Sequence, residues 1–107
     1  MPHESDLQSS ILADLQSFGK YCECFKIMKA NDNGNPDIFF TTGLTGAVLI
    51  EVKRLKGSAS EIQKVKIASF NRCGTKAFVC HTWNQWVEIK KTLGMNVHHN
   101  ELLALRA

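Results

Sequence analysis

The run AVLIEVKR, residues 47–54, places the strongest constraint on how this chain can fold. It is apolar on both faces of a strand up to Ile50, a pattern typical of a strand buried in the centre of a sheet. Glu51 interrupts the run, and Lys53 follows two residues later. Because side chains alternate along a strand, Glu51 and Lys53 share one face and Ile50 and Val52 the other. A carboxylate on a central strand needs a partner, since burying an unpaired charge is strongly unfavourable.

The rest of the chain alternates between helical and extended patterns. Apolar residues at helical spacing from Leu7 to Phe18 indicate a first helix, which Gly19 ends. The further strands are expected over residues 22–28, 37–42 and 77–81, and the further helices over residues 58–73 and 82–93. The order is then α-β-β-β-α-β-α, which predicts an α/β fold with a mixed β-sheet flanked by helices.

The ends of two segments stay open. The first helix begins either at a capping box formed by Ser5 and Gln8, or slightly earlier, at His3 or Glu4. The tail, residues 96–107, is compatible with a short last helix or with a strand used in association.

Length and composition bound the class of protein. A chain of 107 residues fits a single domain, residues 1–107. Hydrophobic residues make up 44% and charged residues 21%, which is ordinary for a soluble globular protein. The N-terminus is polar, and no apolar run approaches the roughly 20 residues that cross a bilayer. These features predict a cytoplasmic protein with no membrane partner.

The four cysteines are Cys22, Cys24, Cys73 and Cys80. We expect free thiols, because the chain carries no export signal and has enough apolar residues to form a core without disulfides. A zinc site is the alternative. The pair Cys22 and Cys24 is closer together than the usual zinc-binding pair, and no second pair has a matching spacing.

Charge is distributed unevenly along the chain. Residues 1–40 hold six acids and three bases, whereas residues 41–107 hold ten bases and four acids. The densest basic run consists of Lys53, Arg54, Lys56, Lys64 and Lys66. This run, together with Lys29 before the turn, is a candidate phosphate-facing surface. A solvated helix face carrying ordinary lysines is the alternative.

A second carboxylate is expected close to Glu51. Asp37 opens the strand that a short hairpin joins to residues 47–54, so antiparallel pairing can bring the two carboxylates together. Neighbouring carboxylates repel, and a cation between them keeps both ionised. Lys53 supplies one charge. Mg²⁺ suits the pair better, because it takes oxygen ligands and typically uses one or two protein carboxylates with water and phosphate.

Such a site predicts phosphodiester hydrolysis. A divalent ion can polarise a phosphoryl oxygen and lower the pKa of a bound water, while Lys53 orients that water or offsets charge in the transition state. The structural alternative is that Glu51 and Lys53 form a partly exposed ion pair at a sheet edge. Asp37 is then only a turn residue after Pro36.

The same residues carry a resemblance to a known family. Pro36-Asp37 followed by Glu51-x-Lys53 reproduces the PD-(D/E)xK nuclease signature, and Ser60-x-x-Gln63 follows on the next helix. Over residues 4–86 the chain resembles a VRR-NUC domain, the minimal stand-alone nuclease module of phage and bacterial proteins. The resemblance implies a restriction-endonuclease-like PD-(D/E)xK core.

The resemblance also implies roles for individual residues. The metal ligands would be Asp37, Glu51 and the backbone carbonyl of Val52. Lys53 would be the catalytic lysine, and Gln63 would lie near the active site and contact the scissile phosphate or a water. Glu4 matches the acidic residue of the family's first helix. The alternatives are a capping role for Gln63 and, for Glu4, a favourable interaction with the helix dipole.

The activity implied is that of a Mg²⁺-dependent, structure-selective DNA endonuclease, with Mn²⁺ as a substitute, that cuts branched DNA such as Holliday junctions. A homodimer is expected, because resolving a four-way junction needs two symmetric cuts. The expected location is the cytoplasm of a bacterial or phage-infected cell. A nuclease acting on linear or flapped DNA and a non-catalytic nucleic-acid-binding module are the alternatives.

Overall fold

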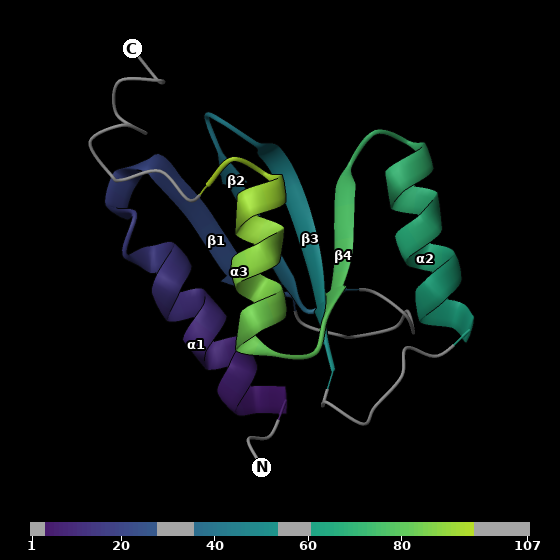
Figure 1. Ribbon diagram of the computed structural model, residues 1–107. Helices are drawn as coiled ribbons and strands as arrows, with labels where there is room; N and C mark the ends of the chain where they lie inside the picture. Colours follow the sequence, from purple (N-terminus) through teal and green to yellow (C-terminus); the bar gives the residue numbers. More distant parts are fainter. Residues whose placement is uncertain (1–3, 28–35, 54–60, 96–107) are drawn as a thin grey trace.

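The computed structural model describes residues 4–27, 36–53 and 61–95. Its elements are α1 (Glu4–Gln16), the short 3-10 helix η1 (Gly19–Tyr21), β1 (Cys22–Lys26), β2 (Ile38–Thr42), β3 (Gly46–Val52), α2 (Glu61–Arg72), β4 (Lys76–Cys80) and α3 (Trp83–Thr92). This is the predicted order with η1 added. The α/β class and the mixed sheet flanked by helices are confirmed (Figure 1).

The described strands form one sheet in the order β1-β2-β3-β4. β1, β2 and β3 pair antiparallel, and β3 pairs parallel with β4 through the crossover helix α2. β3 therefore has a neighbour on each side, as its apolar sequence predicts. The hairpin between β2 and β3 is closed by Thr42, whose hydroxyl accepts hydrogen bonds from the backbone N–H groups of Leu44 and Thr45.

One face of the sheet packs against α1 and α3 (Figure 1). The fully buried residues of this core include Ile11, Leu15, Ile38, Phe40, Val48, Ile50, Val52, Cys80 and Trp86. Trp86 packs edge-on against Phe40, with ring centroids 5.8 Å apart. Its indole N–H donates to Oδ2 of Asp14 at 2.8 Å, and Lys90 Nζ lies 2.7 Å from the same oxygen. Asp14 thus ties α1 to α3.

The opposite face of the sheet carries the alternate residues of the strands. Phe25 and Phe39 stack there with ring centroids 5.0 Å apart, and Phe25 is 56% exposed. α2 is fastened to β4 beside this face. The Asn71 side chain donates to the backbone carbonyl of Ala77 at 3.0 Å and accepts from its N–H at 3.1 Å.

Some expected element ends differ from the structure. α1 begins at Glu4, so Ser5 lies inside the helix and the alternative start at Glu4 is the correct one. Thr82 caps α3 as expected, accepting from the backbone N–H of Gln85 at 3.1 Å. Trp83 remains 43% exposed, because the first turn of α3 turns this ring away from the core that Trp86 enters.

The expected extensions of the strands to residues 28 and 54, the start of the second helix at residue 58 and the tail from residue 96 lie outside the described residues. Among the helices that the structure describes, each is too short or too polar to span a lipid bilayer.

Candidate active site

Six element ends meet at one end of the molecule, the lower end in Figure 1. There α1, β2, α2 and α3 begin, and β3 and β4 end. A short antiparallel hairpin places the start of β2 beside the end of β3, and the parallel crossover returns α2 to the same end. Residues from distant parts of the chain are thereby brought to the point where Glu51 leaves the apolar run.

Glu51 is almost completely buried, with 1% of its surface exposed. Its Oε2 accepts a hydrogen bond from Nε2 of Gln63, on the first turn of α2, at 2.9 Å. Lys53 Nζ lies 3.8 Å from the same oxygen, and the lysine side chain is 20% exposed. The expectation of a partly exposed ion pair at a sheet edge is wrong, because β3 is central and the carboxylate is enclosed.

Asp37 is buried immediately before β2, with 6% of its surface exposed. Its backbone N–H donates to the carbonyl of Ile50 at 2.9 Å, and its own carbonyl accepts from the N–H of Ile27 at 2.7 Å. The side-chain Oδ2 accepts from the backbone N–H of Val52 at 2.7 Å. Asp37 is therefore fixed by β1 and β3 together and is more than a turn residue after a proline.

The donor set suits a hard divalent cation. The carboxylates of Asp37 and Glu51 lie on either side of the backbone of residues 51–52, and Mg²⁺ typically takes one or two protein carboxylates. Among the described residues, no group of three or more His, Cys, Asp or Glu side chains could hold a metal ion. The remaining positions around a cation here would fall to a backbone carbonyl such as that of Val52, to water and to phosphate.

The other predicted site residues are placed less closely. Glu4 is the first residue of α1, and its side chain lies outside the described atoms, as do Lys29, Arg54 and Lys56. Lys64 is on the exposed face of α2, where its Nζ lies 3.4 Å from Oε1 of Glu61. The structure thus brings together Asp37, Glu51, Lys53 and Gln63, and it leaves Lys64 on the surface.

The sequence analysis overlooked Gln8 as a site candidate. This residue lies one turn after Glu4 on α1 and is 9% exposed. No described residue donates a hydrogen bond to its Oε1. A signal was present, because Gln8 shares helical spacing with Ile11 and Leu15, and a polar residue on an apolar stripe is expected to be enclosed.

The cysteines have different chemistry. Burial raises the pKa of the Cys80 thiol to about 11 and is the main cause that raises the pKa of Cys22 to about 12. Both are therefore protonated at neutral pH, and a buried protonated thiol is a poor nucleophile and a poor metal ligand. All four cysteines are free thiols in the structure, and Cys73 is exposed.

Comparison with known families decides the relationship of the chain. The family model described as the VRR-NUC domain matches residues 2–83. This chain belongs to the VRR-NUC family. A solved structure described as a VRR-NUC domain has a TM-score of 0.72 to it at 18% identity, covering 82% of this chain and 94% of that one. A comparison with curated proteins finds no match.

VRR-NUC is a nuclease family, so DNA is the substrate class that membership implies. The matched residues include Asp37, Glu51, Lys53 and Gln63, whereas all but the first residue of α3 lies beyond them. The similar VRR-NUC structure supports the fold. The resemblance seen in the motif, the restriction-endonuclease-like α/β core and the family assignment therefore agree.

Proposed function

We propose that this VRR-NUC protein is a Mg²⁺-dependent endonuclease that cleaves phosphodiester bonds in branched DNA such as Holliday junctions. The observation that carries the proposal is the enclosure of Glu51 beside Asp37 at the end of β3. Two enclosed carboxylates in one place are unfavourable unless a cation compensates them. One lysine at 3.8 Å supplies only part of that compensation.

Each residue of this group has a role that follows from its contacts. Asp37 and Glu51 would hold the ion, which when bound would polarise the phosphoryl group and lower the pKa of a water. The Val52 N–H orients the Asp37 carboxylate, and the Gln63 amide orients that of Glu51. Lys53 is partly exposed, so its charge can stabilise the phosphate in the transition state.

The preference for branched DNA follows from the size of the chain and from symmetry. One subunit has one such site and makes one cut, whereas a four-way junction requires two cuts related by a two-fold axis. A homodimer with two-fold symmetry provides both sites. Mn²⁺ would substitute for Mg²⁺, because it accepts the same oxygen ligands.

A cleavage assay tests this proposal. A labelled four-way junction, a flap and a linear duplex of matched sequence are incubated with the protein in Mg²⁺, in Mn²⁺ or in EDTA. We expect cleavage of the junction in either metal and none in EDTA. Asp37→Asn, Glu51→Gln and Lys53→Ala should each reduce it by about a hundredfold or more, as loss of an electrostatic stabiliser does. Glu88→Gln, at an exposed position on α3, is the matched control and should cleave normally.

The outcomes separate the competing functions. Equal cleavage of the linear duplex would remove the preference for branched DNA, and selective cleavage of the flap would replace the junction as substrate. Binding of DNA without cleavage in both metals would show a non-catalytic module. Light scattering of the protein with and without the junction tests the dimer.

A further inference from the structure

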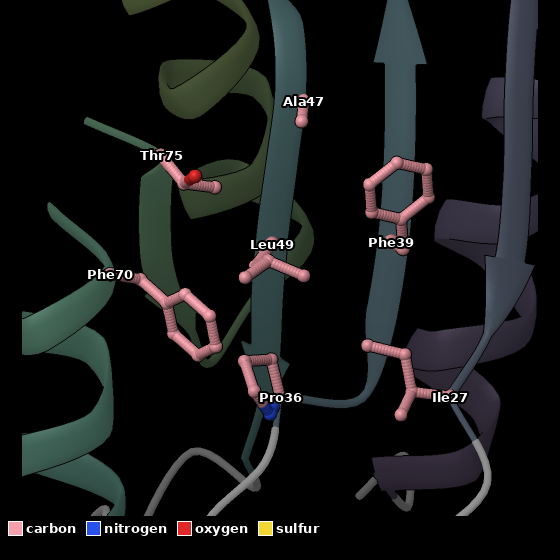
Figure 2. Close-up of a pocket in the computed structure, with 7 residues that line it drawn as sticks. All are labelled: Ile27, Pro36, Phe39, Ala47, Leu49, Phe70 and Thr75. Carbon is pink, nitrogen blue, oxygen red and sulfur yellow. The ribbon is translucent and has the colours of Figure 1, made fainter. Parts of the chain in front are cut away.

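A hollow of about 390 Å³ opens on the face of the sheet opposite α1 and α3. Figure 2 shows its walls: Phe39 on β2, Leu49 on β3, Phe70 on α2, Pro36 at one end and Ile27 just after β1. The Phe70 ring points from the helix toward Leu49 and Pro36, across the hollow from Phe39. No residue of this lining carries a charge.

The hollow is continuous with the candidate active site. Pro36 directly precedes Asp37, and Leu49 comes two residues before Glu51 on the same face of β3. Two residues along a strand span about 6.6 Å. This distance is close to the length of one nucleotide in an extended DNA strand. A phosphate held at the carboxylates would therefore place a neighbouring base over Leu49.

The lining has the chemistry that a nucleobase requires. A base is flat, uncharged and aromatic, and it stacks on aromatic side chains whatever its sequence identity. Phe39 and Phe70 provide such rings, while Thr75 adds one hydroxyl to the wall. The charged groups, Asp37, Glu51 and Lys53, are gathered beside the hollow, where the anionic phosphate would lie.

We propose that this hollow binds an unpaired nucleobase adjacent to the scissile phosphate, a proposal that rests on the nuclease function proposed above. The site then selects DNA in which a base beside the cut is already unpaired, as at a branch point or in a single strand. In a continuous duplex the base would first have to leave the stack, at a cost in free energy. A second copy of the chain fits this place less well, because it would cover the approach of DNA to the carboxylates.

The binding test does not depend on cleavage. Fluorescence anisotropy in EDTA compares a labelled oligothymidylate with an abasic strand of the same length. We expect the wild-type protein to bind the base-containing strand about tenfold more tightly, the effect of stacking one base. Phe39→Leu, which keeps an apolar side chain but removes the ring, should lose most of this difference. Phe25→Leu, the same change outside the hollow, should retain it.

A second variant guards against a folding defect. Ala47 lines the hollow and is exposed, so Ala47→Trp fills the space without removing any packing. It should also abolish the preference for the base-containing strand, with an unchanged melting temperature. Equal binding of the two strands by the wild type, or an equal loss in Phe25→Leu, would overturn the proposal. So would a change from dimer to monomer in Phe39→Leu and Ala47→Trp with the base preference intact, since the hollow would then be a protein interface.

The outcome is distinguishable from failure of the nuclease function. If the wild type cleaves no DNA in either metal, that function fails, and the anisotropy comparison still decides whether the hollow binds bases. If it cleaves, single abasic sites are placed on each side of the mapped cut. We expect slower cleavage from one of these positions with the wild type and with Phe25→Leu, and no added effect with Phe39→Leu. Equal cleavage of all abasic substrates by the wild type would refute the proposal.

Discussion

The side-chain amide of Gln63 donates a hydrogen bond to the carboxylate of Glu51 at 2.9 Å, and both side chains are buried. This contact joins the first turn of the crossover helix α2 to the central strand β3. The position of α2 and the orientation of the carboxylate are therefore set together. Gln63 contributes to the candidate site through Glu51, whatever it contacts in bound DNA.

We predict that Gln63→Ala destabilises the protein and lowers its cleavage rate. Removing the amide takes a hydrogen-bond donor from a buried carboxylate, which costs about 1–3 kcal/mol of unfolding free energy. Urea denaturation measures this loss. Lys64→Ala, the neighbouring exposed position, should stay within about 0.5 kcal/mol of the wild type. Equal stability of Gln63→Ala and the wild type would show that the contact with Glu51 contributes nothing.

Mg²⁺ should stabilise the protein in the absence of DNA. An ion that binds only the folded state, present at a hundred times its dissociation constant, adds about 2.7 kcal/mol to the unfolding free energy. The melting temperature should therefore rise by several degrees on adding Mg²⁺ and return to its starting value with EDTA. Glu51→Gln and Asp37→Asn should not respond to the ion. An equal rise in these variants and the wild type would place the ion elsewhere.

The contact between Asp14 and Trp86 should be a stability determinant. Trp86→Phe keeps a ring against Phe40 but removes the donor to the Asp14 carboxylate, at a cost of about 1.5–3 kcal/mol for a hydrogen bond to a charged group. Thermal or urea unfolding measures the change. Trp83→Phe on the same helix, where the ring is 43% exposed, is the control and should cost less than 1 kcal/mol. Equal effects at both positions would contradict this role for Asp14.

The buried thiols predict loss of stability at alkaline pH. The folded state raises the pKa of Cys22 and Cys80 from 9.0 to about 12 and about 11, so between these values the folded state binds more protons than the unfolded one. The stabilisation is complete below pH 9 and is lost as the pH rises, by up to about 1.4 kcal/mol per pH unit for each thiol. Urea denaturation at pH 8 and pH 10 measures the difference.

The control for this effect removes the thiols. Cys22→Ala combined with Cys80→Ala should reduce the difference between the two pH values, because lysine and tyrosine titration is common to both proteins. A difference of the same size in the double variant would assign the alkaline effect to other groups.

Much of the site could be predicted because it depends on short-range patterns. The apolar run ending in Glu51 identified the central strand, and the short hairpin brought Asp37 to its end. Alternation along β3 and the helical spacing of α2 were enough to relate Glu51 to Lys53 and Gln63.

Features that depend on how complete elements pack could not be predicted. Periodicity shows that Trp83 and Trp86 share a helix, but only the packing of α1 against α3 decides which ring is enclosed. The hollow beside Phe39 results from the position of α2 over one part of the sheet, which no local pattern encodes.

The bonds from Asp14 to Trp86 and Lys90 link residues separated by 72 and 76 positions in the chain. During synthesis, the strands that carry Asp37 and Glu51 emerge well before α3 does. Their apolar face therefore has no cover from this helix until nearly 90 residues have left the ribosome, and contacts between distant residues form slowly. The nascent protein must pass through a stage with an exposed sheet, so its yield in the cell will depend on protection from aggregation at that stage.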